Sequence, residues 1–210
     1  MDRIPAILLT GPAGSGKTTL LNRLLRQPPM AGTLVVVAEF GATALDHCLV
    51  AHASTDAAGG LNAGCACCAV RADLAATLRD APWRFSRGGR RGFERVVIEA
   101  GDATEPEAVL ELFEAGWRVA SRYRLDGVFA MVDVGLLVRD HEMAAPAERQ
   151  LASADIVLAN RSGGLDAAGL DRMARRLARL NPRAGPRWLP AETVDAGTFL
   201  APLRPPAAAR

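Results

Sequence analysis

The sequence is poor in lysine, histidine and aromatic residues, and it lacks any long apolar run. Among 210 residues there are one lysine, Lys17, three histidines and one tyrosine, and the basic residues are otherwise all arginine. No apolar stretch approaches the roughly 20 residues that are needed to cross a bilayer, and the N-terminal segment has no cleavage site of a secretory signal. We therefore expect a cytoplasmic protein without a membrane partner.

Net charge and cysteine content exclude further classes. The net charge of +2 is too small to favour nucleic acid as the main partner. Half of the residues are apolar and 23% are charged, which is typical of a globular protein. Four cysteines, of which three lie at positions 65, 67 and 68, do not resemble a disulfide framework. Reduced thiols are therefore available as metal ligands.

Short apolar runs alternate with helical patterns along the chain. Runs rich in Val, Ile and Leu predict buried strands at 4–10, 33–38, 95–99, 127–132, 155–159 and 187–189. Periodic apolar positions predict helices at 20–26, 70–79, 105–114 and 170–180. Because strand and helix alternate, we predict an α/β fold of the P-loop NTPase type, with a mostly parallel sheet and helices on both faces.

The predicted domain is single and covers residues 1–200. Residues 201–210 are rich in proline and alanine, and we expect them to form a frayed tail. Residues 54–64, which are rich in alanine and glycine, and residues 81–92, which carry several arginines, are expected to be loops.

Residues 11–18 fit the pattern G-x-x-x-x-G-K-[ST] at every fixed position, and they lie between a predicted strand and a predicted helix. Glycines let successive backbone N–H groups converge on phosphate oxygens, and the helix N-terminus adds partial positive charge. We predict that Lys17 binds the β- and γ-phosphates of a nucleoside triphosphate and that Thr18 coordinates Mg²⁺. The predicted nucleotide contacts of this segment are Gly11, Gly14, Ser15, Gly16, Lys17, Thr18 and Thr19.

An acidic residue at the end of a neighbouring strand is also required to order Mg²⁺ and its waters. Glu99 directly follows an apolar run, and Asp133 has a similar place after a later one. Glu99 is preferred because Gly101 follows it and could donate its backbone N–H to the γ-phosphate. Either acid could instead cap a helix.

Cys65, Cys67 and Cys68 form a C-x-C-C motif. Three thiols within four residues can converge on one ion, and zinc takes four ligands, so one position remains for Glu39, a histidine, water or a transferring partner. An incomplete ligand shell suits a site that must release its metal. A redox pair and plain structural cysteines are the alternative interpretations.

Seven segments together resemble the CobW-like GTPases, relatives of the nickel-inserting HypB and UreG proteins. In chain order these segments are GPAGSGKTTLLNRLL, VVVAEFGATALD, GCACC, VVIEAGDATEP, FAMVDV, ADIVLAN and LNPRA. The resemblance implies a metal-chaperone GTPase in which the C-x-C-C motif binds zinc, cobalt or another transition metal. It implies that GTP binding and hydrolysis gate metal transfer to a client protein, and a homodimer is one assembly that we consider.

The resemblance also implies a role for Glu39, and we predict a role for Glu99 or Asp46. Glu39 would lie near the cysteines and act as a metal ligand. Glu99 or Asp46 would position the waters of Mg²⁺ or the attacking water.

The base-recognition segment departs from the family pattern. Family members select guanine through Asn-Lys-x-Asp, whereas this chain has Asn160 and Arg161 followed by Ser162 and Gly163. Arg161 can replace the lysine stem, but Gly163 offers no carboxylate, and Asp166 could substitute only if the loop is rearranged. A site without this acceptor loses discrimination between bases, so the sequence leaves GTP and ATP open.

Two more departures keep other functions in view. Asp102 stands where the family has glycine, and Ala38 precedes Glu39 where the family has asparagine. The alternatives are a P-loop ATPase or small-molecule kinase with incidental cysteines, and a nucleotide-binding scaffold that does not hydrolyse.

Overall fold

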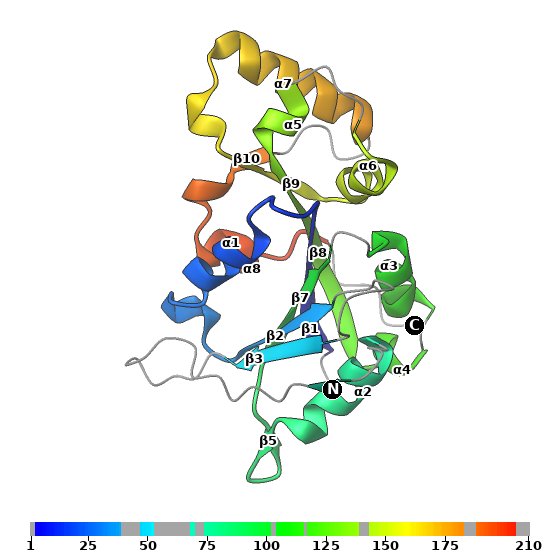
Figure 1. Cartoon of the computed structure of the whole chain (residues 1–210). Coiled ribbons are helices and arrows are strands. Elements are labelled where there is room, and N and C mark those ends of the chain that lie inside the picture. Colours follow the sequence, from blue (N-terminus) through cyan, green and yellow to red (C-terminus); the bar gives the residue numbers. More distant parts are fainter. Residues whose placement is uncertain are drawn as a thin grey trace.

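The structure is a computed structural model that describes residues 3–38, 47–52, 68–69, 74–101, 104–115, 117–138, 143–182 and 188–204. Within these ranges the chain forms one large β-sheet with helices on both faces (Figure 1). None of the helices in these ranges has both the length and the apolar composition that a bilayer span requires.

The large sheet has the order β10-β9-β8-β1-β7-β2-β3-β4. The first six strands in this order are mutually parallel, β3 is antiparallel to β2, and β4 is antiparallel to β3. The parallel part confirms the predicted fold class and contains all six predicted strands. The bounds are β1 Ile4–Thr10, β2 Thr33–Ala38, β3 His47–His52, β4 Cys68–Ala69, β7 Arg95–Ala100, β8 Tyr123–Asp133, β9 Ile156–Asn160 and β10 Trp188–Pro190.

Helices connect these strands. Four of them overlap the predicted helices, namely α1 Lys17–Leu24, α2 Leu74–Arg84, α3 Pro106–Glu114 and α7 Ala167–Leu180. Four short helices were not predicted: α4 Trp117–Ala120, α5 Val134–Val138, α6 Ala145–Ala152 and α8 Ala196–Leu200. The 3-10 turns are η1 Pro28–Met30, η2 Ser162–Gly164 and η3 Ala191–Thr193.

Alternating side chains of the central strands fill two separate cores. On β1, Leu8 belongs to the core under α2, α3 and α7, and Leu9 belongs to the core under α1 and α8. Both side chains are fully buried. In the second core the rings of Phe129 on β8 and Phe199 on α8 lie 4.7 Å apart. Because both faces are covered, the strands read as continuous apolar runs, which is why the sequence predicted them well.

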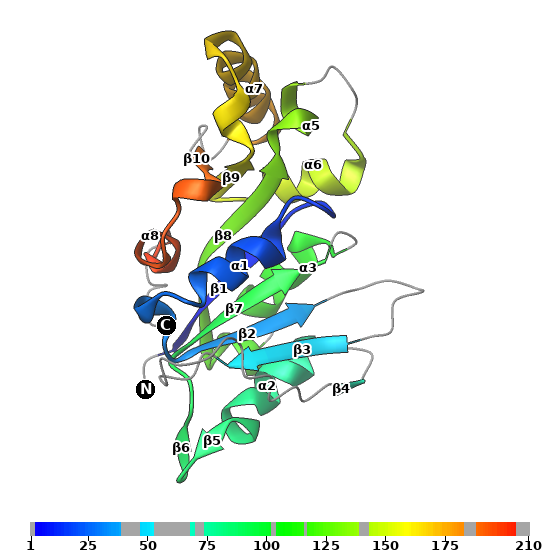
Figure 2. The same ribbon diagram turned by 60° about the vertical axis from the view of Figure 1, so that its left-hand side comes forward.

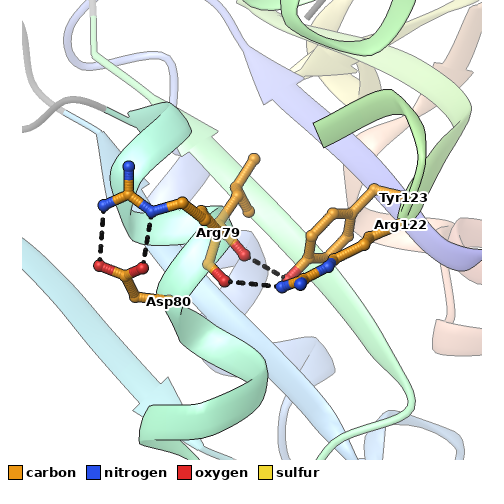
Figure 3. A network of polar contacts seen from close by, with 5 residues as sticks. Arg79, Asp80, Arg122 and Tyr123 are labelled. Carbon is orange, nitrogen blue, oxygen red and sulfur yellow. Dashed lines mark hydrogen bonds and ion pairs between the residues drawn. The ribbon is translucent and has the colours of Figure 1, made fainter. Parts of the chain in front are cut away.

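Residues 81–92 are not a loop, which corrects the prediction. The α2 helix continues through Pro82 to Arg84, and Ser86–Arg87 (β5) and Arg90–Arg91 (β6) form a small hairpin. Pro82 has no N–H for the carbonyl of Leu78, four residues earlier. The hydroxyl of buried Tyr123 donates to that carbonyl instead, at 2.7 Å (Figure 3).

The neighbouring carbonyl of this helix also receives a donor from outside. Arg122 donates to the Arg79 carbonyl at 3.2 Å, and the Arg79 side chain forms an ion pair with Asp80 (Figure 3). Burial raises the pKa of Tyr123 far above its usual value, so the phenol remains a donor. The helix therefore tolerates proline because a distant strand supplies the missing hydrogen bond.

The last described residues contact the sheet. The backbone N–H groups of Leu203 and Arg204, in the segment predicted to be a tail, donate to the carbonyl of Asp126 at 2.8 and 2.9 Å. The Arg204 side chain pairs with Asp155 at 2.8 Å. Residues 205–210 and the predicted loop at 54–64 lie outside the described residues.

Candidate nucleotide-binding site

The loop between β1 and α1 is pressed against the ends of two neighbouring strands. Gly11 has φ +137°, and a Cβ atom there would lie 2.1 Å from the carbonyl oxygen of Met131 on β8. Gly16 has φ +101°, and its Cβ atom would lie 2.8 Å from the side-chain nitrogen of Asn160 on β9. Both positions favour glycine because other residues rarely adopt this backbone conformation, and at Gly11 a side chain would also collide with backbone atoms of Met131. The loop therefore has the tightly curled backbone that phosphate binding needs.

Lys17 is held inside this loop. Its side chain is 8% exposed, and the ammonium group donates to the carbonyls of Gly11 at 2.7 Å and Pro12 at 3.1 Å. The α1 helix begins at Lys17 and has no acidic residue of its own in its first turn, so the positive end of its dipole points into the loop. Ser15 is 1% exposed, and its hydroxyl has no hydrogen-bond partner among the described residues. These features together suit an anion.

Thr18 and Glu99 meet below the loop. The Thr18 hydroxyl donates to the Glu99 carboxylate at 2.6 Å, and Glu99 is 5% exposed. Glu99 comes from β7, which pairs directly with β1. A hydroxyl and a carboxylate at this place form the hard oxygen donor set that Mg²⁺ prefers, so the chemistry of the residues fits this ion.

Asp133, the second candidate acid, has other partners. One of its carboxylate oxygens accepts the N–H of Gly135 at 2.8 Å, and the other accepts from the Arg161 guanidinium at 2.5 Å. The structure thus separates the two acids that the sequence could not distinguish with certainty. Glu99 contacts the P-loop, whereas Asp133 contacts the segment after β9.

The structure differs from the prediction at Gly101. Its backbone N–H, which was expected to meet the γ-phosphate, donates to the carbonyl of Ala38 at 2.8 Å. This hydrogen bond extends the pairing of β2 and β7 by one residue, so the Gly101 N–H is already bonded at the carboxyl ends of these two strands. Asp46, the other candidate for positioning water, lies outside the described residues.

Asn160 and Arg161 form a second part of the site, where β9 ends. The Asn160 side chain donates to the Ser15 carbonyl at 2.9 Å, which joins β9 to the P-loop. Arg161 has φ +61°, and its backbone N–H donates to the carboxylate of Glu192 at 2.7 Å. Asp166 is the N-cap of α7 and accepts the N–H of Gly169 at 2.7 Å, so the loop rearrangement that would free it is not observed.

A cavity of about 490 Å³ is lined both by the P-loop and by Asn160 and Arg161. Its volume is in the usual range for small-molecule sites. Its lining residues come mainly from the P-loop and α1, from the segment after β9 and from the segment that joins β10 to α8. Figure 2 shows the backbone of these elements. Its lining residues are Gly14, Gly16, Lys17, Thr18, Thr19, Leu20, Arg23, Met131, Asn160, Arg161, Ala191 and Glu192. Glu192 was not among the predicted site residues, because no local motif connects it to the P-loop.

Most of the predicted transition-metal site lies outside the described residues, including Glu39, Cys65 and Cys67. Cys68 begins β4 and pairs in register with Cys48 on β3. Cys48, the fourth cysteine, was not predicted as a ligand because it precedes the C-x-C-C motif by 17 residues in the sequence. Within the described residues no group of three or more His, Cys, Asp or Glu side chains could hold a metal ion.

A glycine loop with Lys and Thr after the first strand, followed by a helix and supported by an acid from the adjacent parallel strand, defines a P-loop nucleotide-binding protein. The sequence model of the CobW/HypB/UreG nucleotide-binding domain matches residues 5–186. The chain therefore belongs to this family, as the resemblance of its motifs predicted.

The chain is similar in sequence to proteins that are named zinc chaperones. The chain is 33% identical over 185 residues to the zinc chaperone YjiA of Escherichia coli K12, which covers 88% of this chain and 57% of YjiA. It is 27% identical over 215 residues to the zinc chaperone CobW of Pseudomonas aeruginosa, which covers 88% of this chain and 56% of that protein. The chain thus spans little more than half the length of these relatives.

A solved structure shows the same fold. The crystal structure of Zn(II)-bound YjiA GTPase from E. coli matches with a TM-score of 0.66 at 27% identity. The match covers 97% of this chain and 62% of YjiA. The fold therefore has an experimental counterpart.

Proposed function

We propose that this chain binds GTP with Mg²⁺, hydrolyses it, and couples the nucleotide state to the binding of zinc or a similar transition metal and its delivery to a client protein. The observation that carries the proposal is the contact of Thr18 with Glu99 beneath a complete P-loop, beside a cavity that fits a small molecule. The relatives that are named zinc chaperones support the metal function. We further propose that residues 1–200 form one NTPase domain, that the segment 201–210 follows it with Leu203 and Arg204 bound to the sheet, and that the domain acts in the cytoplasm.

The phosphate-binding residues provide charge stabilisation. We expect the Lys17 ammonium to leave the carbonyls of Gly11 and Pro12 for phosphate oxygens, because charged acceptors form stronger hydrogen bonds. The N-terminus of α1 and the N–H groups of the loop would bind the same phosphates. Lys17 would then stabilise the charge that develops when the γ-phosphoryl group is transferred to water.

Thr18 and Glu99 would hold Mg²⁺. When bound, this ion would neutralise negative charge on the phosphates. Glu99 is suited to this role because it is buried on the side of β7 that faces α1. Asp46 is proposed to orient the attacking water. Thr19 and Gly14, which line the cavity, would contact the phosphates from its mouth.

Zinc is the proposed cargo, with Cys65, Cys67, Cys68 and Glu39 as its ligands. Thiolates favour zinc, cobalt and copper, and the chemistry does not choose among them. The paired strands β2 and β7 connect this site to the nucleotide site, because Val37 on β2 pairs in register with Glu99 on β7. Glu39 is two residues after Val37 in the sequence.

The test measures phosphate release from GTP and zinc affinity in the same preparation. We expect Mg²⁺-dependent phosphate release, and a zinc affinity that differs about fivefold or more between a non-hydrolysable GTP analogue and GDP. Zinc affinity is measured by competition with a chromophoric chelator. Absence of phosphate release together with equal zinc affinity in both nucleotide states would refute the proposal.

A further inference from the structure

The position that usually carries the guanine-selecting acid has no side chain in this protein. Gly163 occupies it within η2, and a Cβ atom built there would have no neighbour within 4 Å. Asp166 caps α7 and does not line the cavity. The segment after β9 therefore offers no carboxylate to a base.

We propose that Glu192, in η3 after β10, supplies this carboxylate and selects guanine. The proposal rests on the proposed function in one respect, that the cavity binds a nucleoside triphosphate. Glu192 lines the cavity together with Asn160 and Arg161, which are the remaining parts of the base-recognition segment. The proposed acid therefore comes from the segment after β10, and not from the segment after the neighbouring strand β9.

The Glu192 carboxylate is fixed by one hydrogen bond and keeps its charge available. One oxygen accepts the backbone N–H of Arg161 at 2.7 Å. The Arg161 guanidinium, which also lines the cavity, forms an ion pair with Asp133 instead. Among the described residues no ion pair includes Glu192, so its second oxygen is available for a ligand.

Contacts with α1 and the turn that follows it hold the segment that carries Glu192. Arg23 on α1 donates to the Ala191 carbonyl at 2.7 Å. Gln27, just after α1, accepts the N–H of Ala196 at 2.8 Å. Because α1 also begins at the P-loop, these contacts fix the distance between the phosphate end and Glu192. Such rigid support is what a specificity-determining group needs.

The chemistry of the two purine bases decides the preference. Guanine presents an N1–H and a 2-amino group side by side, and both can donate to a carboxylate. Adenine has a lone pair at N1 and no 2-amino group, so it would place an acceptor against the negative charge. Glu192 is exposed in this structure, and a base that covers it must bring donors to the carboxylate, because an unpaired carboxylate under the base would weaken binding. Glu192 therefore favours guanine over adenine.

The experiment measures dissociation constants of GTP, ATP and xanthosine triphosphate with Mg²⁺ by isothermal titration calorimetry. The test variant is Glu192→Gln, which retains an oxygen that can accept the Arg161 N–H. One control is Asp166→Asn, because asparagine is an equally good N-cap. The second control is Glu111→Gln on the exposed face of α3.

We expect the native chain and both controls to prefer GTP to ATP, and Glu192→Gln to lose about 10- to 100-fold in GTP affinity while its ATP affinity is retained. Xanthine carries an oxygen in place of the 2-amino group, and the glutamine amide can donate to this oxygen. Xanthosine triphosphate should therefore bind Glu192→Gln more tightly than the native chain. Unchanged GTP preference in Glu192→Gln would overturn the proposal, as would its loss in Asp166→Asn. Equal binding of GTP and ATP by the native chain would also overturn it. Binding of no triphosphate at all would instead refute the proposed function.

Discussion

The two ends of the nucleotide cavity are built in different ways. The phosphate end consists of eight consecutive residues, 11–18, whose backbone conformation is set by glycines at Gly11 and Gly16. The other end is assembled from Asn160, Arg161 and Glu192, which come from two loops more than 30 residues apart. A motif records the first kind of construction, whereas only the fold brings the second kind together.

This difference explains which site residues could be predicted. The P-loop was recognisable because its function depends on local backbone geometry. Glu99 was also recognisable, because the end of a strand next to β1 is a fixed place in such sheets. Glu192 was not recognisable, since its relation to the base-binding segment depends on the packing of η3 against α1 and on the pairing of β9 with β10.

The largest effect is expected at Gly11, where the local construction is tightest. Gly11→Ala places a Cβ atom 2.1 Å from the Met131 carbonyl in an unfavourable backbone conformation. We expect the free energy of unfolding to fall by about 3 kcal/mol or more. Gly14→Ala is the matched control, because φ is +72° there but no atom lies within 4 Å of its Cβ, and it should cost about 1 kcal/mol. Urea unfolding measures both, and equal costs would show that the close contact is not important.

The second prediction concerns Glu99, which joins a neighbouring strand to the P-loop. Glu99→Gln removes the charge that would hold Mg²⁺, and we expect phosphate release to fall about 100-fold. The control is Asp133→Asn, an acid at the end of β8 whose partners are Arg161 and Gly135, and it should change the rate little. Steady-state phosphate release at saturating GTP measures the effect. A larger loss in Asp133→Asn would transfer the proposed role to Asp133.

A third comparison uses the cysteines on β3 and β4. Cys68→Ser removes a thiolate from the C-x-C-C motif, and we expect zinc affinity to fall about tenfold or more, since loss of even an outer-shell partner of a metal ligand has an effect of this size. Cys48→Ser leaves the motif intact but changes the residue opposite Cys68, so we expect a smaller loss. Competition with a chromophoric chelator measures both variants. Native affinity in Cys68→Ser would remove this residue from the ligand set.

The smallest effect is expected where a distant strand supplies a hydrogen bond to α2. Tyr123→Phe leaves the Leu78 carbonyl without its donor and should lower the free energy of unfolding by about 1 kcal/mol. In a Pro82→Ala background the same substitution should cost less, because alanine restores a backbone N–H to the helix. Urea unfolding of the two single variants and the double variant measures this coupling. Additive costs would show that Tyr123 does not replace the bond that Pro82 removes.

The fold was predictable to a similar degree as the site, and for related reasons. The six parallel strands were found because burial on both faces makes them continuously apolar. The antiparallel β3 was missed because its apolar run, residues 48–51, is only four residues long and lies between two histidines. The helix through Pro82 was missed because its tolerance for proline depends on Tyr123, about 40 residues away. The short helices α4, α5, α6 and α8 are too brief for their periodicity to be visible.

The most direct test of the account is the affinity of the native chain and of Lys17→Ala for GTP with Mg²⁺, measured by isothermal titration calorimetry. Lys17 is the single lysine of the sequence and is held within the P-loop by the carbonyls of Gly11 and Pro12. If this loop binds the triphosphate, removal of the ammonium group should weaken binding by about 100-fold. Native affinity in Lys17→Ala would contradict the assignment of residues 11–18 as the phosphate-binding site.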